Sequence, residues 1–496
     1  MDLTRALNVQ LHDVVTFTGG GGKTSSMLRL AAELVAAGRH VVVTTTAKLG
    51  SDQIPVPVAG RAMPHLIAPR AGDLAGLVSE ALRRSPVLAV TGEAIEDGTR
   101  WDGIEPAAVC ELAAARGVDV VLVEGDGSRG LPLKAPADYE PVVPECTTLH
   151  VPLAGALALG QPLDADHVHR PELVARFGNW GPLDERVVTA ELMAALLAHP
   201  AGGMKGRPAS VSPAKGARRR GPRLRTVVMI NQCDGGRVAL MRPVAQELLK
   251  SREIDAVLLS AVAPPDGMPA AGPVLERHVR VSAIILAAGA SERFGETKQL
   301  LPWGPRRVPL VVHVVERVRA ARGLTEVYVA VGHRAEDVAR QVVGQAVALV
   351  YCQDWAKGQA HSVRAALRVI PADIGAVVFA LCDQPGVTPE LIESLLQRQR
   401  ETGASIVAPR APDGRRGTPT LWDRRMFPAL RRLQGDAGGR GLIDAHAARG
   451  EVAWVEAPAE ALRDIDTRED LEALREGHQA AGNGQQGADG SPVPVA

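Results

Sequence analysis

The chain has 496 residues, of which 46% are apolar and 23% are charged, and its formal net charge is zero. This length exceeds one ordinary hydrophobic core, so two or three domains are expected. The neutral charge and an aromatic content of 3% give no support to nucleic-acid binding. No apolar run reaches the roughly 18 residues needed to cross a bilayer, so no membrane association is expected.

The cysteines and the N-terminal residues favour the cytoplasm. Five cysteines are scattered along the chain without a CxxC pair, which favours a reducing compartment and gives no thiolate metal site. The first residues, MDLTRALNVQLHDVV, lack a basic patch followed by an apolar stretch, so no signal peptide is expected.

Strands and helices alternate along the chain, which predicts an α/β protein with mainly parallel sheets. Helical periodicity is clearest over 24–38 and 309–323. The predicted strands fall into two series, 14–18, 40–46, 118–125, 225–231 and 255–261, then 282–289, 326–332, 348–352, 376–383 and 405–409. We therefore predict two doubly wound domains, an N-terminal P-loop-like NTPase and a C-terminal Rossmann-like nucleotidyltransferase.

Loose segments set the expected boundaries. Residues 263–273 are rich in Pro, Gly and Ala and predict an interdomain connection, which gives domains of 1–278 and 279–476. Residues 201–225 are rich in Gly, Pro, Ser and Arg and predict a flexible basic insert. The polar tail, 477–496, is expected to be disordered.

The stretch FTGGGGKTSS, residues 17–26, lies between a predicted strand and a predicted helix. We predict a nucleotide site formed by Gly19, Gly20, Gly21, Gly22, Lys23 and Thr24. A phosphate loop reads G-x-x-x-x-G-K-[ST]; this chain matches the end of that pattern but has Phe17 in place of the leading glycine. Lys23 would reach the β- and γ-phosphates, and Thr24 would face Mg²⁺. The alternative is an ordinary glycine-rich turn.

Polar residues follow two other strands of the N-terminal series. Strand 118–125 delivers Glu124 and Asp126, and we predict that Asp126 joins Thr24 as a magnesium ligand. Asn231 and Asp234 have the spacing of a guanine-reading N-K-x-D motif, although a polar turn after a strand would look the same. Further on, GQPLDADHVHRPE holds two histidines that could bind a metal, but a hydrogen-bonded loop before a helix is favoured.

The C-terminal series opens with LAAGASERFGETK, residues 286–298. Small residues around Ala288 and Gly289 let backbone amides approach a triphosphate. Arg293 and Lys298 supply cations, and Lys298 could neutralise a leaving pyrophosphate. Two carboxylates are candidate ligands for Mg²⁺: Asp383 ends an apolar strand, and Asp466 precedes a helix. The alternatives are a surface-charged connection for the loop and a helix N-cap for Asp466.

These residues resemble the MobA-like nucleotidyltransferases, and among them the molybdenum cofactor cytidylyltransferases, over residues 282–476. Further matching stretches are DWAKGQAHSVRAAL (354–367), CDQP (382–385), GTPTLWD (417–423), GDAGGR (435–440) and DIDTRED (464–470). The resemblance implies transfer of a nucleoside monophosphate to the phosphate of molybdopterin, with release of pyrophosphate. The chain departs from the family at Cys352 and Gln353, where Asn-Pro is usual, and at Phe294, where Met is usual.

The resemblance also implies roles for individual positions. Ala288 and Gly289 would lie near the nucleotide, and Arg293 and Lys298 at its phosphates. The carboxylates of Asp383 and Asp466 would hold Mg²⁺. The two alanines of LAAG resemble cytidylyl-transferring members, whereas guanylyl-transferring members more often read LAGG, so CTP is favoured over GTP as the substrate.

The N-terminal motifs GGGGKTS, EGDGSRGLPLKAP and LDADHVHRPE resemble the YqeC family, accessory proteins of selenium-dependent molybdenum hydroxylases. This resemblance implies NTP binding and hydrolysis in the service of cofactor maturation. Together, the two halves predict a maturation factor whose protein partner is a molybdenum hydroxylase apoenzyme. The alternatives are a sugar- or polyol-phosphate nucleotidyltransferase and a non-catalytic cofactor carrier.

Overall fold

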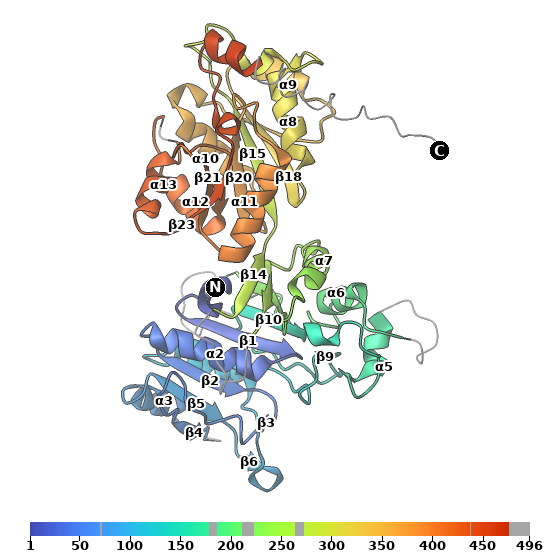
Figure 1. Ribbon diagram of the computed structural model, residues 1–496. Coiled ribbons are helices and arrows are strands. Elements are labelled where there is room, and N and C mark those ends of the chain that lie inside the picture. The colour runs from blue at the N-terminus through green and yellow to red at the C-terminus, as the bar shows by residue number, and fades with distance from the viewer. Residues whose placement is uncertain (70–71, 178–185, 211–222, 263–271, 437, 476–496) are drawn as a thin grey trace, which may run out of the picture. The chain divides into compact units, whose positions relative to one another are not determined.

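The computed structural model describes residues 1–69, 72–177, 186–210, 223–262, 272–436 and 438–475. The chain divides into two compact units, Met1–Val279 and Arg280–Ala496 (Figure 1). Most of the predicted connection at 263–273 and the whole predicted tail at 477–496 lie outside the described residues. No described helix is both long enough and apolar enough to cross a membrane.

A nine-stranded sheet organises the N-terminal unit, and all its pairings are parallel except that of the edge strand β14. In sheet order the strands are β14 (Val274–His278), β13 (Ala256–Ser260), β12 (Arg225–Asn231), β10 (Leu149–Gly155), β1 (Asp13–Gly19), β8 (Val120–Glu124), β2 (Val41–Thr45), β5 (Val87–Thr91) and β4 (His65–Ile67). Its central strands are buried along their length, which explains runs such as VVLV in β8.

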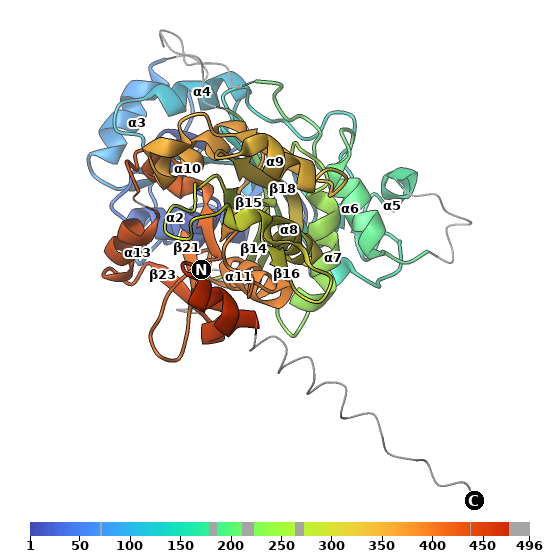
Figure 2. The ribbon, with the colours of Figure 1, turned by 90° about the horizontal axis from the view of Figure 1, so that it is seen from above.

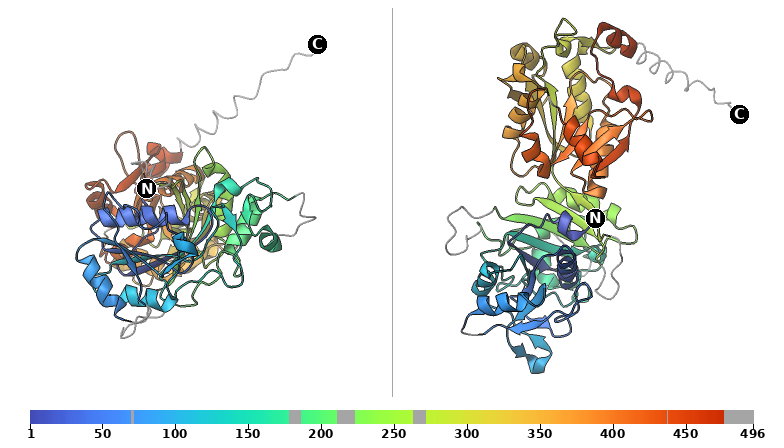
Figure 3. Two further views of the ribbon diagram at one scale, coloured as in Figure 1. Left: turned by 90° about the horizontal axis from the view of Figure 1, so that it is seen from below. Right: turned by 90° about the vertical axis from the view of Figure 1, so that its left-hand side faces the viewer.

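Helices cover both faces of this sheet. α2 lies along the sheet as a blue helix (Figure 1, Figure 3) and contacts β1, β2 and β8. Another cluster joins α3 and α4 to β2 and β5, and a third joins α6 and α7 to β12 and β13. The helices are α1 (Leu3–Ala6), α2 (Lys23–Ala36), α3 (Leu74–Leu82), α4 (Pro106–Ala114), α5 (Pro171–Val174), α6 (Ala190–Ala198) and α7 (Val238–Leu248).

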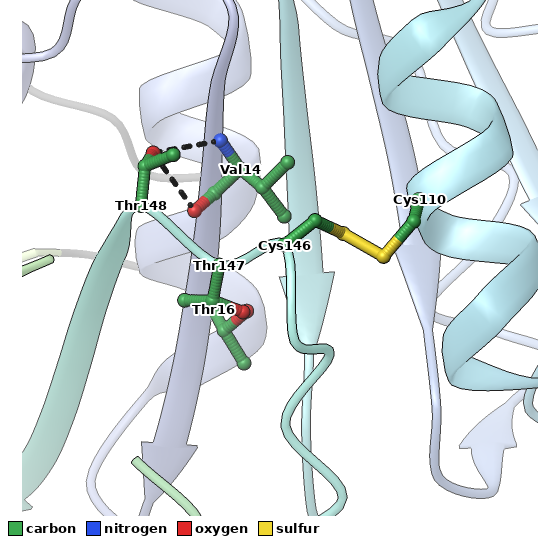
Figure 4. Close-up of a disulfide and its surroundings, with 6 residues drawn as sticks. All are labelled: Val14, Thr16, Cys110, Cys146, Thr147 and Thr148. Carbon is green, nitrogen blue, oxygen red and sulfur yellow. Dashed lines mark hydrogen bonds between the residues drawn. A yellow bond between two sulfur atoms is a disulfide. The ribbon is translucent and has the colours of Figure 1, made fainter. Parts of the chain in front are cut away.

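A disulfide joins Cys110 on α4 to Cys146, which precedes β10 (Figure 4). The cysteine count favours a reducing compartment, in which disulfides are rare, so this pairing departs from the expectation. The two residues are 36 positions apart, and only the packing of α4 beside the sheet brings their Cα atoms to 5.7 Å. The neighbouring Thr147 and Thr148 bond to β1, so the disulfide ties α4 to the strand that carries the glycine loop.

The prediction of a flexible insert at 201–225 is wrong at both ends of this range, where the residues are ordered and make specific contacts. Met204 is buried in the core between α6 and α7, and Lys205 donates to the carbonyl of Ala137 at 2.6 Å. At the other end, Arg225 begins β12 and pairs with Asp13 at 2.5 Å. Only 211–222, the most basic part, lies outside the described residues.

A seven-stranded sheet organises the C-terminal unit, with β22 antiparallel to both of its neighbours. α10 and α12 pack on one face, and α8 and α11 pack together on the other; Figure 2 shows α10 and α11 on opposite sides of β15. In sheet order the strands are β19 (Ala348–Tyr351), β18 (Leu324–Val331), β15 (Val281–Ala287), β20 (Ala376–Leu381), β22 (Thr420–Asp423), β21 (Ile406–Arg410) and β23 (Val452–Glu456). The helices are α8 (Leu310–Ala320), α9 (Ala335–Gln341), α10 (Gln359–Val369), α11 (Pro389–Thr402), α12 (Phe427–Leu430) and α13 (Arg440–Ala447).

Small sheets complete the structure: β9 (Leu133–Lys134) with β11 (Val168–His169), β16 (Pro302–Trp303) with β17 (Val308–Pro309), and β3 (Leu49–Gly50), β7 (Arg100–Trp101) and β6 (Ala94–Ile95). The prediction of two α/β units with mainly parallel sheets is confirmed. In such sheets ligands bind at the carboxyl ends of the strands, and both candidate sites lie there.

Candidate functional site

The loop after β15 has backbone amides free to meet an anion. The side chain of Gln299 holds the loop in its conformation. Its Nε2 donates to the backbone carbonyls of Ala287 (3.1 Å) and Gly289 (2.9 Å). The carbonyl of Ala288 accepts the amide of His333 at 3.0 Å. Among the described residues, no acceptor pairs with the amides of Gly289, Ala290 or Ser291. Successive unpaired amides of this kind are a suitable binding place for an anion.

Lys298 follows this loop and binds two carboxylates from distant parts of the unit. Its Nζ lies 3.1 Å from Oδ2 of Asp383 and 3.0 Å from Oδ1 of Asp466. Burial disfavours the charged ammonium, but the two carboxylates outweigh it, so the pKa of Lys298 is raised. The ammonium is therefore charged at neutral pH, and three predicted residues meet at one point.

Arg293 lies at the rim. Its side chain is 84% exposed, and its guanidinium is 3.9 Å from Oδ2 of Asp466. Such an exposed pair contributes little to stability. The side chain is free to turn toward a ligand, so the position fits a phosphate contact made only when substrate is bound.

These residues form part of the lining of a cavity of about 580 Å³. The loop of Ala288 to Arg293, with Lys298, Asp383 and Asp466, forms part of its wall. The rest includes Trp355, Gln359, Ser362 and Asp436, to which the sequence reasoning assigned no role, although they fall in the matching stretches DWAKGQAHSVRAAL and GDAGGR. The volume lies within the range of small-molecule sites.

The two carboxylates suit a hard divalent cation. Asp383 and Asp466 already converge on one positive charge, the Lys298 ammonium. Across the described ranges, no group of three or more His, Cys, Asp or Glu side chains is arranged to hold a metal ion. Mg²⁺ commonly takes one or two carboxylates and completes its shell with phosphate oxygens and water, so the donor set fits a cation that arrives with a nucleotide.

The glycine loop of the N-terminal unit fits closely against β10. A Cβ on Gly19 would lie 2.2 Å from the carbonyl oxygen of Leu153, and one on Gly21 would lie 2.3 Å from the amide nitrogen of Gly155. Both glycines have positive φ, of 95° and 84°. Side chains are thus excluded by space and by backbone conformation.

The side chains around this loop are paired with one another. The Nζ of Lys23 donates to the carbonyl of Gly19 at 2.6 Å and lies 3.4 Å from Asp126. Thr24 donates to Glu124 at 2.8 Å. Burial raises the pKa of Glu124, although Lys23 and Thr24 favour its ionised form.

Asp126, the predicted magnesium ligand, has other partners. Its carboxylate accepts a hydrogen bond from the backbone amide of Gly19 at 3.0 Å and forms an ion pair with Lys134 at 2.9 Å. Lys134 in turn pairs with Glu140, which pairs with Arg170 at 2.7 Å. Sequence reasoning missed this buried network. The only signal in the sequence was the LPLKAP stretch, which contains Lys134 and was used only as part of a family resemblance. Glu124 is the carboxylate that contacts Thr24.

The remaining candidates also have hydrogen-bond or ion-pair partners within the protein. Asn231 donates to the carbonyl of Gly21 at 2.9 Å and accepts the amide of Val262 at 2.8 Å, so it supports the glycine loop. Asp234 lies 3.8 Å from Arg237. His167 bonds to Asp164 at 2.7 Å, which agrees with the favoured interpretation of a hydrogen-bonded loop.

Comparisons with known proteins agree with this division. Residues 15–172 match the family model of the YqeC protein, and residues 283–450 match that of the MobA-like NTP transferase domain. The chain is 31% identical over 195 residues to the uncharacterized protein YqeC of Escherichia coli (strain K12), covering 39% of this chain and 71% of that protein.

The C-terminal unit has relatives of its own. The chain is 36% identical over 126 residues to the bifunctional protein GlmU of Exiguobacterium sibiricum, covering 25% of this chain but only 27% of that protein. The crystal structure of Rv0371c from Mycobacterium tuberculosis H37Rv is 29% identical, with a TM-score of 0.36, covering 40% of this chain and 98% of that chain. The chain therefore belongs to the YqeC family through its N-terminal unit, and its C-terminal unit is a MobA-like nucleotidyltransferase domain.

Proposed function

We propose that the C-terminal unit transfers CMP from CTP to the phosphate of molybdopterin and releases pyrophosphate, in the cytoplasm, as a step in the maturation of molybdenum hydroxylases. The observation that carries this proposal is the meeting of Lys298, Asp383 and Asp466 beside the open amides of the LAAG loop. Phosphoryl-group chemistry needs positioning and charge stabilisation more than a protein nucleophile, and this cavity offers both.

The reaction requires no covalent enzyme intermediate. A phosphate oxygen of the acceptor attacks the α-phosphorus of CTP and forms a new P–O bond. The bond to the bridging oxygen breaks, and its electron pair leaves with pyrophosphate. Lys298 would donate a hydrogen bond to the oxygen that gains charge, and the amides of Gly289 and Ala290 would hold the phosphates.

Asp383 and Asp466 would hold Mg²⁺, which supplies charge neutralisation on the phosphate oxygens when it is bound. Lys298 would then shift from the carboxylates to the phosphates. The second alanine of LAAG, Ala288, is only 5% exposed and lines the cavity. A methyl group there narrows the base site compared with glycine, which favours the smaller pyrimidine and thus CTP over GTP.

For the N-terminal unit we propose NTP binding and hydrolysis that assist maturation or transfer of the cofactor to a hydroxylase apoenzyme. The amides of Gly20 and Gly21 already donate to the carbonyls of Leu153 (3.0 Å) and Leu131 (3.1 Å). The amides of Gly22 and Lys23, at the start of α2, would therefore hold the phosphates. Because Glu124 already contacts Thr24, these two side chains would hold Mg²⁺, while Asp126 holds the loop and the buried lysines in place.

The proposal is tested by incubating the full chain with Mg²⁺, α-labelled CTP and molybdopterin, and measuring labelled product and pyrophosphate. Asp383→Asn should abolish both, whereas Asp337→Asn, a carboxylate on α9 with two arginine partners, should not. Transfer to a sugar or polyol phosphate instead of molybdopterin would identify the rival nucleotidyltransferase. Silence with every NTP and authentic molybdopterin would contradict catalysis and favour a carrier.

A further inference from the structure

Two arginines and a tryptophan form a cluster near the cavity that the reaction described above does not use. The guanidinium carbon of Arg410 lies 5.2 Å from the ring centroid of Trp454, and that of Arg416 lies 5.7 Å from it. Arg416 also pairs with Asp444 on α13 at 2.8 Å. We call Arg410, Arg416 and Trp454 the arginine–tryptophan cluster.

The sheet places this cluster at the edge that carries Asp383. β20 and β21 are both antiparallel to β22, so they run parallel to each other. Arg410 is the last residue of β21, and Asp383 lies shortly after the last residue of β20, so both are at the carboxyl ends of their strands. Two strand spacings separate the strands, which is about 10 Å.

The cluster also lies on the same face of the sheet as the cavity wall. Trp454 pairs with Ala408 and packs against the core on the α10 side. Gln359 and Ser362, which line the cavity, belong to α10. The loop after the cluster returns to the reaction centre, because Thr418 hydrogen-bonds to Gln384, the residue next to Asp383.

The charge of the cluster is not balanced. Arg410 and Arg416 are exposed, and among the described residues the only carboxylate paired with either is Asp444. The neighbouring Arg415 has its own partner, Asp413, at 3.1 Å. Guanidiniums held over an indole keep their planar N–H groups available to a ligand.

We propose that the arginine–tryptophan cluster binds the ring end of the acceptor, a flat heterocycle that carries a ring carbonyl oxygen. Arginine N–H groups donate to such an oxygen, as they do to the O6 atom of guanine, and a pterin ring presents a carbonyl oxygen of this kind. This inference rests on the proposed function. An acceptor whose phosphate lies at Asp383 would extend about 10 Å across β22 to the cluster.

The test uses the full chain and two independent measurements. In the transfer assay, Arg410→Ala and Arg416→Ala should each raise the KM for molybdopterin about tenfold or more while the KM for CTP stays unchanged. Arg410→Lys should not restore the KM, because an ammonium lacks the planar fork. Arg398→Ala, an exposed arginine on α11, is the matched control.

The second measurement is binding of free pterin, followed by its fluorescence anisotropy. The wild type and Arg398→Ala should bind it, and the double variant Arg410→Ala/Arg416→Ala should bind at least tenfold more weakly. An unchanged molybdopterin KM or unchanged pterin binding overturns the inference. If the wild type transfers nothing to molybdopterin but the arginine variants still lose pterin binding, the proposed transfer reaction fails and the ring site stands.

Discussion

The ammonium of Lys298 lies 3.1 Å from the carboxylate of Asp383, although 85 residues separate them in the chain. The strand that ends before Asp383 lies directly beside the strand that leads into the LAAG loop. Parallel pairing thus brings the two charges to one edge, and Asp466 adds a third group at 3.0 Å from the same nitrogen. The central hypothesis depends on this meeting of charges.

We expect Lys298→Ala to lower kcat for CMP transfer by about a hundredfold or more, because a buried donor to the leaving oxygen is lost. Steady-state pyrophosphate release at saturating CTP measures this. Lys250→Ala removes an exposed lysine that pairs with Glu247 and should leave kcat unchanged. A Lys298→Ala variant with wild-type kcat would remove this lysine from the mechanism.

Glu124 makes the stability of the N-terminal unit depend on pH. Burial raises its pKa in the folded chain above the usual 4.5. A carboxyl group with a raised pKa stabilises the folded chain while it is protonated. This stabilisation is complete below the pKa of the group in the unfolded chain, and it is lost as the pH rises through the pKa of the group in the folded chain. We therefore expect Glu124→Gln to raise the unfolding temperature at pH 8, and this gain to shrink toward pH 5.

Calorimetry of the full chain at several pH values measures the effect of Glu124→Gln. Glu80→Gln is the control, since Glu80 is exposed and pairs with Arg84. If Glu124→Gln unfolded at or below the wild-type temperature throughout this pH range, the ionised carboxylate would be stabilising, contrary to the expectation.

A comparison of two glycines distinguishes the energetic cost of a left-handed backbone from that of close packing. Gly21 and Gly38 have similar φ values, 84° and 78°, but only Gly21 is crowded; nothing lies within 4 Å of a Cβ on Gly38. Gly38→Ala should cost about 1–2 kcal/mol through its left-handed backbone alone. We expect Gly21→Ala to cost more and to abolish NTP binding at the N-terminal loop. Urea unfolding and nucleotide titration test both statements, and equal costs would argue against close packing of the loop.

The disulfide should contribute to stability of the N-terminal unit. Closing a loop between residues 36 positions apart restricts the unfolded chain, and such bonds typically contribute about 2–4 kcal/mol. Replacing Cys110 and Cys146 together with serine should lower the free energy of unfolding by that amount. A reductant should lower the stability of the wild type but not of the double variant. An unchanged wild type in reductant would mean that the thiols are unpaired in solution.

Sequence reasoning found the features that local pattern determines. Apolar runs that end in glycine or aspartate identified β1, β15 and β20, because buried parallel strands leave functional groups at their carboxyl ends. The predicted strands do not include β10, the neighbour of β1, which holds Pro152, a residue type that is unusual in a central strand. The strand survives because it pairs in parallel on both sides around the proline.

Contacts that depend on how loops and helices fold back onto the sheet could not be read from the chain. The pairing of Lys134 with Asp126 depends on how the loop after β8 folds back, and Cys110 meets Cys146 only through helix packing. The approach of Arg410 to Trp454 requires the pairing of β21 with β23. Each is set by tertiary packing that no local spacing records.

The most direct test of the central claim is a matched measurement of CMP transfer with α-labelled CTP, Mg²⁺ and molybdopterin. The wild type and Asp126→Asn should form labelled molybdopterin and pyrophosphate in equal amounts, because Asp126 belongs to the N-terminal unit. Asp383→Asn and Asp466→Asn should form neither above background. Wild-type product formation by both C-terminal variants would contradict the assignment of this carboxylate pair to catalysis.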